Sequence, residues 1–306
     1  MRIDSHLHLN FKNIRTGGDI VAYLDRHNLD KCWLLTWEEL RPVIPCEYRH
    51  LSVRDVCEAY RANPSRIVPM YAPDPATPDL ERKISRYYEK GLLGLGELKV
   101  SLDWDSPLIE RFLTIASRYR LPVVFHMEEP GYFPYSHHSL NRIYNATVNR
   151  NNRIGRRLHD HNKSGNGYFP GYLPDFGSLE KRLQQFPAVH FIGHGQLFWK
   201  GIAQDEGDSR FFPDAPVKKE GALVHLLRTY DNLSADLSGH SGYNALSRDR
   251  SYAKGFVAAF GHKLLYGTDN YRYNVEDLLN GLDLTRTTMD RIMGLNAFEI
   301  TDQQEQ

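Results

Sequence analysis

Short runs of apolar and β-branched residues alternate with longer amphipathic segments along the chain. A run of about four to eight such residues bounded by turn residues predicts a strand, and apolar residues at every third or fourth position predict a helix. The predicted strands are 2–9, 31–36, 66–72, 92–100, 121–127, 188–194, 232–238 and 263–269. The predicted helices are 18–28, 52–63, 79–91, 106–120, 176–186, 218–230, 245–260 and 274–299.

This alternation predicts an α/β fold, a (β/α)8 TIM barrel formed by residues 1–306 as a single domain. A chain of 306 residues has the usual size of such a barrel. An open dinucleotide-binding sheet is disfavoured, because no glycine-rich turn follows the first strand. Two connections are long, after the fifth strand (129–175) and after the sixth (195–217). Such loops often bind ligands or cover a site, and the aromatic composition of the first indicates that it faces the substrate.

Four predicted strands contain a potential metal ligand at one end. Side chains at i and i+2 of a strand point to the same side, so His6 and His8 are expected to project together from the first strand. His126, His194 and Asp269 each follow apolar residues at the ends of the fifth, sixth and eighth strands. Because the parallel strands of a barrel share a direction, these residues are predicted to meet at the mouth where such enzymes have their active sites.

These residue types indicate metal chemistry. A divalent cation binds neutral imidazole nitrogens and carboxylate oxygens, and a catalytic site leaves a coordination position for water. The sequence therefore predicts a divalent metal held by His6, His8, His126 and Asp269, with zinc favoured and manganese as the alternative. Asp269 is also predicted to accept a proton from the water that the ion acidifies. Glu97, in the fourth strand, is a candidate bridge to a second ion.

The sequence resembles the amidohydrolase superfamily in five motifs: HLH at 6–8, FHM around His126, IGHG around His194, GTD at 267–269 and MGLNAFEI at 293–300. The resemblance is to its amidohydrolase-related branch, which also contains decarboxylases, hydratases and lactonases. It implies the same four ligands for one metal, with His194 near the substrate as a catalytic residue. In two-metal relatives the residue matching His194 binds the second ion, and Glu97 resembles the bridging ligand of TatD-like deoxyribonucleases. One ion is favoured, and two are the alternative.

Four further residues are candidates for substrate contact: Lys99, His240, Trp199 and Arg142. Lys99 shares a strand face with Glu97, and an internal pair between the two is the alternative. His240 follows the seventh strand and is expected to face the mouth. Trp199 follows the sixth strand, where it either lines the pocket or packs against the long loop. Arg142 belongs to a basic cluster in the first long loop, interpreted as a solvated face or as a clamp for an anionic substrate.

Charge and composition limit which binding partners and which cellular compartment are expected. Lysine plus arginine equals aspartate plus glutamate, 38 against 38, so no overall field attracts nucleic acid or anionic membranes and a small-molecule substrate is expected. The amino terminus lacks the apolar core of a secretory signal, and no stretch approaches the ~20 apolar residues of a membrane span. Three cysteines without a CxxC pattern argue against disulfides. A cytoplasmic enzyme is expected, and a homo-oligomer is left open.

The favoured hypothesis is a metal-dependent hydrolase in which water attacks the carbonyl of an amide, lactone or ester, with His194 stabilising the developing oxyanion. The first alternative is a metal-dependent decarboxylase acting on an aromatic or unsaturated carboxylic acid, because its ligands would be the same. The second is a non-catalytic barrel with a decayed site, which intact potential ligands at the expected strand ends disfavour. The sequence does not specify the substrate, because specificity is expected to lie in the two long loops.

Overall fold

The computed structural model describes residues 1–43, 48–132, 168–204, 210–271 and 273–302. A strand forms within each of the eight predicted strand segments, and the paired strands among them run parallel. In chain order they are β1 (Ile3–His8), β2 (Lys31–Leu35), β3 (Ile67–Pro69), β4 (Leu95–Leu98), β5 (Val123–His126), β8 (Phe191–His194), β9 (Leu233–Asp236) and β10 (Leu264–Leu265).

The strands form two groups, with the orders β1-β2-β3 and β10-β9-β8-β5-β4. Backbone hydrogen bonds connect the two groups on both sides, at a seam between β3 and β4 and at a second seam between β10 and β1. These bonds run from Tyr71 N to Gly94 O (3.0 Å), Leu93 N to Pro69 O (3.1 Å), Ser5 N to Tyr266 O (2.9 Å) and Asp269 N to His6 O (2.8 Å). The sheet is therefore closed, and the predicted (β/α)8 barrel is confirmed.

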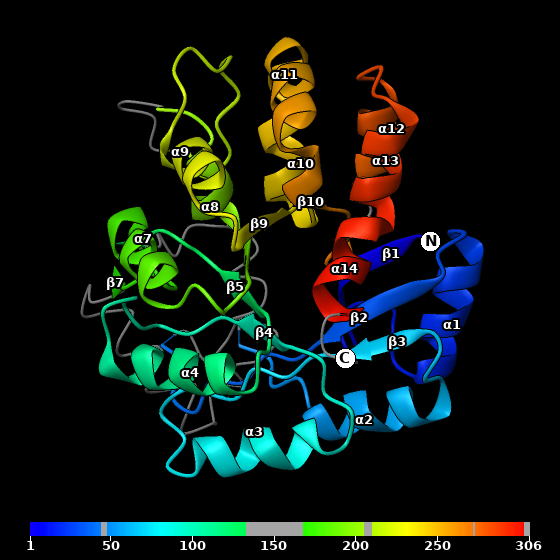
Figure 1. Cartoon of the computed structure of the whole chain (residues 1–306), viewed down its shortest axis with the longest axis vertical. Helices are drawn as coiled ribbons and strands as arrows, with labels where there is room; N and C mark the ends of the chain where they lie inside the picture. Colours follow the sequence, from blue (N-terminus) through cyan, green and yellow to red (C-terminus); the bar gives the residue numbers. More distant parts are fainter. Residues whose placement is uncertain (44–47, 133–167, 205–209, 272, 303–306) are drawn as a thin grey trace, which may run out of the picture.

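Helices surround the strands (Figure 1). They are α1 (Gly17–Arg26), α2 (Val53–Ala62), α3 (Leu80–Tyr88), α4 (Pro107–Arg118), α7 (Phe176–Gln185), α8 (Gln196–Lys200), α9 (Ala222–Thr229), α10 (Gly239–Ser247), α11 (Arg250–Phe260), α12 (Val275–Asn280), α13 (Arg286–Asp290) and α14 (Asn296–Asp302). None of the described helices is both long and apolar enough to cross a membrane.

Two predicted helices are divided in the structure. The segment predicted at 245–260 belongs to α10 and α11, because Asp249 starts a new helix by accepting a hydrogen bond from the backbone N–H of Tyr252 (3.0 Å). The segment predicted at 274–299 contains α12, α13, a π-helical turn and the start of α14. Thr285 caps α13 in the same way, by accepting from the N–H of Thr288. Helical periodicity continues across these caps, so the breaks were not predicted.

The first long connection begins and ends in a short antiparallel pair, β6 (Gly131–Tyr132) with β7 (Tyr168–Phe169). Its central part, residues 133–167, lies outside the described residues, and so does the candidate Arg142. The second connection begins with α8 directly after β8. Both connections leave the carboxyl ends of their strands, as predicted.

The barrel interior is apolar below its mouth. Val124 and Ile192 point inward, two residues before His126 and His194, so the predicted strand parity is confirmed for these two strands. In β1 the pairing register shifts between Asp4 and Leu7, which explains how residues three positions apart, Ile3 and His6, both face inward. The interior cluster contains Ile3, Trp33, Leu35, Val68, Met70, Val124, Ile192, Leu265 and Ala297.

The start of α14 closes the bottom of the barrel. Asn296 is 3% exposed, and its side-chain amide donates to the carbonyls of Gly261 (2.8 Å) and Leu264 (2.7 Å). Gly294 packs so closely on the chain start that a Cβ atom there would lie 2.5 Å from the Met1 carbonyl. The GxNA motif therefore joins the end of the chain to its beginning.

We expect Asn296→Ala to destabilise the fold by about 1–3 kcal/mol, because two buried carbonyls lose their donor. Urea unfolding followed by circular dichroism measures this change. Asn280→Ala, at an exposed position in α12, is the matched control and should change stability by less than about 0.5 kcal/mol. Equal stability of the two variants would contradict this role of Asn296.

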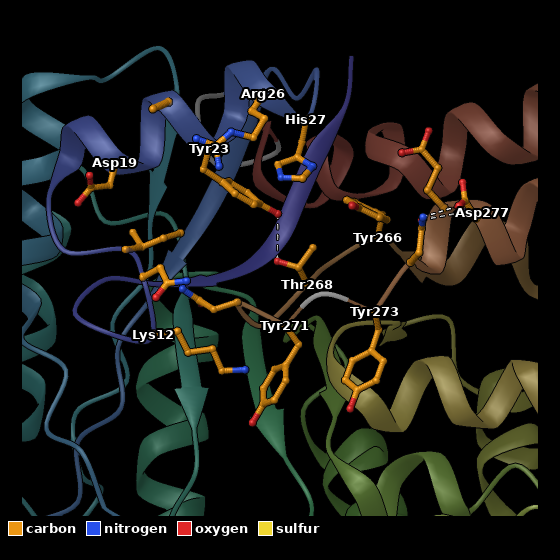
Figure 2. A pocket seen from close by; sticks show the side chains of 16 residues that line it. Lys12, Asp19, Tyr23, Arg26, His27, Tyr266, Thr268, Tyr271, Tyr273 and Asp277 are labelled. Carbon is orange, nitrogen blue, oxygen red and sulfur yellow. Dashed lines mark hydrogen bonds between the residues drawn. The ribbon is translucent and has the colours of Figure 1, made fainter.

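A cavity of about 1070 Å³ lies beside the barrel, between α1 and the segment that joins β10 to α12 (Figure 2). Its wall is fixed by Asp4, whose carboxylate accepts hydrogen bonds from the hydroxyls of Tyr23 (2.8 Å) and Thr268 (2.7 Å). Burial raises the pKa of Asp4 to about 6, although these hydrogen bonds oppose the rise. The lining includes Lys12, Tyr23, Tyr266, Thr268, Tyr271 and Tyr273.

Candidate metal centre

The structure brings the predicted strand-end residues together at the carboxyl end of the barrel. They come from β1, β4, β5 and β8 and from the residues that follow β10: His6, His8, Glu97, His126, His194 and Asp269. The first five are at most 9% exposed. A cluster of ionisable groups this deeply buried needs charge compensation within itself.

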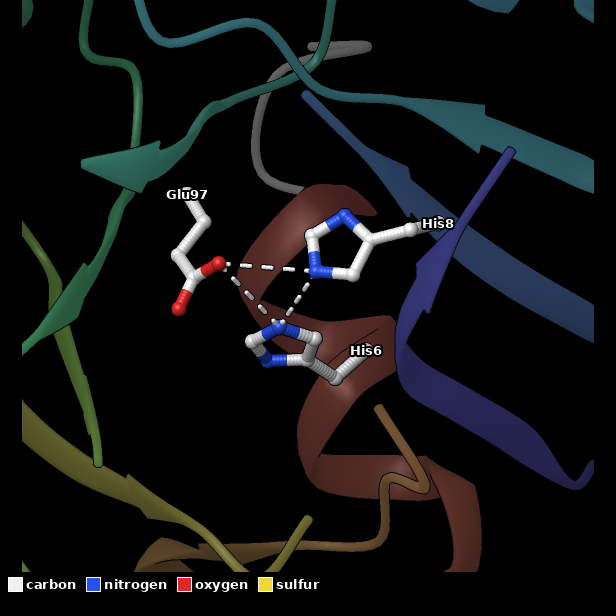
Figure 3. Close-up of side chains that lie close together, drawn as sticks. All are labelled: His6, His8 and Glu97. Atoms are coloured by element: carbon white, nitrogen blue, oxygen red, sulfur yellow. Dashed lines mark hydrogen bonds and ion pairs between the residues drawn. The ribbon is translucent and has the colours of Figure 1, made fainter. Parts of the chain in front are cut away.

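Four donor atoms form the first group (Figure 3 shows three of the residues). Nε2 of His6 lies 3.1 Å from Nε2 of His8. Oε2 of Glu97 lies 3.8 and 3.4 Å from these two nitrogens, and Oδ1 of Asp269 lies 3.9 and 3.4 Å from them. Ligand atoms about 2.0–2.1 Å from a tetrahedral zinc ion are roughly 3.3 Å apart. The group therefore has the dimensions of a coordination shell.

The hydrogen bonds of the two imidazoles define which nitrogen carries the proton. Nδ1 of His6 lies 2.6 Å from a carboxylate oxygen of Asp236, and Nδ1 of His8 lies 3.0 Å from the carbonyl of Leu35. Both partners only accept, so both Nδ1 atoms donate, and each Nε2 carries a lone pair when its imidazole is neutral. Two lone pairs that face each other across 3.1 Å repel unless a proton or a metal cation lies between them.

A second group shares Glu97 with the first. Glu97, His126 and His194 each offer a ligand atom, and these atoms lie within 4.8 Å of one another. Oε1 of Glu97 accepts a hydrogen bond from Nδ1 of His126 at 2.8 Å, while Oε2 faces the first group. Nε2 of His126 is buried without a hydrogen bond, and Oε2 of Glu128 lies 3.3 Å away. His126, predicted in the first ligand set, is thus placed in the second group, and Glu97 takes its position.

His194 is held as a neutral imidazole by a short hydrogen-bond chain. The hydroxyl of Ser238 donates to Asp236 (2.9 Å), so its oxygen accepts from Nδ1 of His194 (2.9 Å). Nε2 of His194 therefore carries a lone pair and lies 3.9 Å from Oδ2 of Asp269. Burial and the charge of His6 lower the pKa of His194 to about 3. This pattern favours an accepting or metal-binding nitrogen over the oxyanion donor predicted from the sequence.

Charges within the first group oppose the effect of burial. Burial lowers the pKa of His6, but Asp236 and Glu97 raise it well above its ordinary value. The pKa of His8 is also raised, because hydrogen bonds to Asp269 and Glu97 outweigh burial. Burial would raise the pKa values of both acids, yet the imidazoles hold that of Glu97 well below its usual range and lower that of Asp269. The carboxylates stay ionised, and the imidazoles retain a proton until a cation replaces it.

Sequence reasoning missed the residues that orient the ligands. Asp236 is fully buried at the end of β9 and fixes both His6 and, through Ser238, His194. The side chain of Asn270 accepts from the N–H of His8 (2.8 Å) and donates to its carbonyl (2.9 Å), which ties the turn after β10 to β1. The strand-end rule that identified the other residues also applies to Asp236, the last residue of its strand.

Three of the residues proposed as substrate contacts lie among the described residues, and each packs against an aromatic ring. Trp199 is 1% exposed, packs with Phe198 and donates to the carbonyl of Asp236 (2.8 Å), so it is a packing residue. It does not face the substrate side because α8 directs the Trp199 ring into the apolar layer between the barrel and the helices. The ring of His240 is stacked on Tyr273 with centroids 4.7 Å apart. The alternative that Lys99 pairs with Glu97 is wrong, because the two side chains form no ion pair. The Nζ of Lys99 lies instead 4.4 Å from the centroid of the Trp37 ring.

Comparison of the sequence with protein-family models gives no match, and comparison with curated proteins gives none. Solved structures are similar in fold. An amidohydrolase from Burkholderia multivorans with bound zinc has a TM-score of 0.59 at 11% identity, over 99% of each chain. A probable 2-pyrone-4,6-dicarboxylic acid hydrolase from Acinetobacter baumannii has a TM-score of 0.54 at 13% identity, over 98% of this chain and 99% of that one.

A third structure is a 5-carboxyvanillate decarboxylase from Novosphingobium aromaticivorans, complexed with manganese and 4-hydroxy-3-methoxy-5-nitrobenzoic acid. It has a TM-score of 0.53 at 13% identity, over 99% of this chain and 96% of that one. This chain has the same barrel fold as these solved structures. The resemblance found in the sequence motifs is thus confirmed at the level of the fold.

We expect the affinity of this protein for a divalent ion to fall as the pH decreases. His6 and His8 hold protons below their raised pKa values, so an ion must displace them and each displaced proton costs about tenfold in affinity per pH unit. Competition with a chromophoric chelator at pH 6 and pH 8 measures this dependence. His225→Ala, at an exposed histidine paired with Glu180, should leave the dependence unchanged. An affinity equal at both pH values would contradict the role of the two imidazoles.

Proposed function

We propose that this protein is a metal-dependent hydrolase that uses water to open the amide, lactone or ester bond of a small molecule. The observation that carries the proposal is the pair of facing Nε2 atoms of His6 and His8, 3.1 Å apart and flanked by two carboxylates. Orientation of both imidazoles by outer hydrogen-bond acceptors is a feature of metal-ligating histidines. The hydrolases among the solved structures of this fold support the same interpretation.

The donor groups fit one or two divalent ions. His6, His8, Glu97 and Asp269 would hold the first ion, and Glu97, His126 and His194 would hold a second. Because Glu97 directs a different oxygen to each group, we propose two ions where the sequence favoured one. Imidazole and carboxylate ligands suit zinc and manganese, the metals present in two of the solved structures of this fold.

A bound divalent ion supplies an acidified water molecule and polarises the substrate carbonyl. Asp269 is ionised and 19% exposed at its side chain, so Oδ2 is placed to accept the proton that the attacking water loses. His194, 3.9 Å from Oδ2, offers a second accepting nitrogen that Ser238 and Asp236 keep in one orientation. These groups hold the proton near the reacting carbonyl, from which it can pass to the leaving group.

A decarboxylase is the second candidate function. A solved decarboxylase has the same fold, and the donor groups would orient a carboxylated aromatic substrate equally well. Product analysis distinguishes the reactions: CO2 release from a carboxylated aromatic supports the lyase, and ring or ester opening with proton release supports the hydrolase. The decayed-site hypothesis is disfavoured, because every predicted metal ligand lies in the cluster.

We expect chelation to abolish turnover and added zinc or manganese to restore it, because no other described group at the cluster replaces the Lewis acid. Hydrolysis of a panel of lactones, aryl esters and amides, followed by proton release, provides the assay. Activity that is indifferent to chelators would exclude the proposed mechanism.

We expect Glu97→Gln to lower the metal content from two ions to fewer than one per chain, since Glu97 serves both groups. His126→Ala should remove only the second ion. Glu129→Gln is the matched control, because Glu129 pairs with Lys200 instead (2.7 Å). Metal analysis of refolded and metal-equilibrated protein measures the content, and circular dichroism verifies folding. A wild-type content of one ion that His126→Ala leaves unchanged would restrict the metal to the first group.

A further inference from the structure

Lys12 lies on the connection between β1 and α1, directly beside the metal centre. Its Nζ lies over the ring of Tyr271, 2.6 Å from the centroid, and 5.5 Å from the centroid of Phe11 (Figure 2 shows Lys12 and Tyr271). The ring of Phe11 in turn contacts the ligand His8, with centroids 5.8 Å apart. The ring of Phe11 therefore lies near both the ammonium group and a residue of the first donor group.

The backbone that carries Lys12 is held in a defined shape. Asn10 and Lys12 both have left-handed backbone angles, with φ of 61° and 51°, which persist only where surrounding contacts support them. The side chain of Asn270 donates to the carbonyls of His8 (2.9 Å) and Phe11 (3.3 Å). Asn10 is also fixed, because its amide donates to Asp55 (2.8 Å). The residue that positions the turn of Asp269 thus also positions Lys12.

The ammonium group has no ion-pair partner among the described carboxylates; it contacts the two rings and lies in the field of Asp269. Burial lowers the pKa of Lys12 to about 8, and Asp269 opposes this shift. In the absence of a metal, the positive charge of Lys12 balances the negative charge of Asp269. A divalent ion bound to Asp269 would neutralise this carboxylate and leave the ammonium group without a counter-charge.

The surface next to Lys12 suits a flat molecule. The rings of Tyr271 and Tyr273 are stacked with centroids 5.9 Å apart, and Tyr273 is stacked on His240 at 4.7 Å. Lys12, Tyr271 and Tyr273 also line the cavity beside the barrel (Figure 2). Planar groups stack on such rings, while the ammonium group provides a charged hydrogen-bond donor at their edge.

We propose that Lys12 is a specificity-determining residue that binds an anionic group, a carboxylate or a phosphate, on a planar substrate whose reacting bond lies at the metal centre. This inference rests on the proposed function, since it places the substrate at that centre. Lys12 takes no part in bond breaking. It selects anionic substrates over neutral ones of the same shape.

Calorimetric titration with benzoate, phenyl phosphate and the neutral isostere benzamide tests the inference, in metal-loaded and in chelator-treated protein. Wild-type protein should bind at least one anion about tenfold more tightly than benzamide, the effect of one charge-assisted hydrogen bond. Lys12→Met should abolish this preference, and Lys12→Arg should retain it. Lys90→Met is the matched control, because Lys90 also lies over a tyrosine ring (Tyr87, 5.3 Å) but outside the site.

If Lys12→Met weakens the binding of benzoate more than that of phenyl phosphate, a carboxylate is the preferred group. If it weakens the binding of phenyl phosphate more, a phosphate is the preferred group. Wild-type protein that binds neither anion more tightly than benzamide overturns the inference, and so does an anion preference that Lys12→Met leaves intact. A protein that binds no metal would refute the proposed hydrolase. The Lys12 inference is then decided in the chelator-treated protein, where the anion preference should be weaker, because Asp269 competes for the ammonium group, but still lost in Lys12→Met.

Discussion

The chemistry of this barrel depends on two imidazole nitrogens that face each other across 3.1 Å. Each imidazole donates its proton outward, to Asp236 or to the backbone of β2, so the lone pairs converge. Such a pair is stable only with positive charge between its members. Two carboxylates beside it make that charge favourable, and their ionised state follows from the same contacts. The outer hydrogen bonds therefore determine the character of the site as much as the ligands do.

The fold supports this arrangement from below. An apolar cluster that includes Val124 and Ile192 fills the barrel under the donors, so that little water reaches them from that side. Electrostatic interactions are stronger in such a medium than in bulk water. The register shift in β1 turns His6 inward although Ile3 already faces the interior. A regular strand would have pointed one of these residues away from the centre.

Much of this arrangement could be predicted from the sequence, because a histidine or aspartate that ends an apolar strand is costly to bury unless a partner or a cation meets it. That rule identified His126, His194 and Asp269, and the alternation of elements identified the barrel. It could not place His126 in the second donor group or show that Glu97 belongs to both groups, since this depends on which nitrogen or oxygen faces which neighbour. Lys12 was missed for a different reason: a lysine in a short connection is usually solvated, and only the folded chain places it over Tyr271.

The seam between β10 and β1 gives the metal centre a further significance. β10 has only two residues, and the first and last strands are joined by few backbone hydrogen bonds. His6 and His8 lie on one side of this seam and Asp269 on the other. A cation bound by these side chains would cross-link the first strand of the barrel to the segment that follows its last strand. Loading the protein would then raise the resistance of the whole barrel to opening, as expected for a ligand that binds only the folded state.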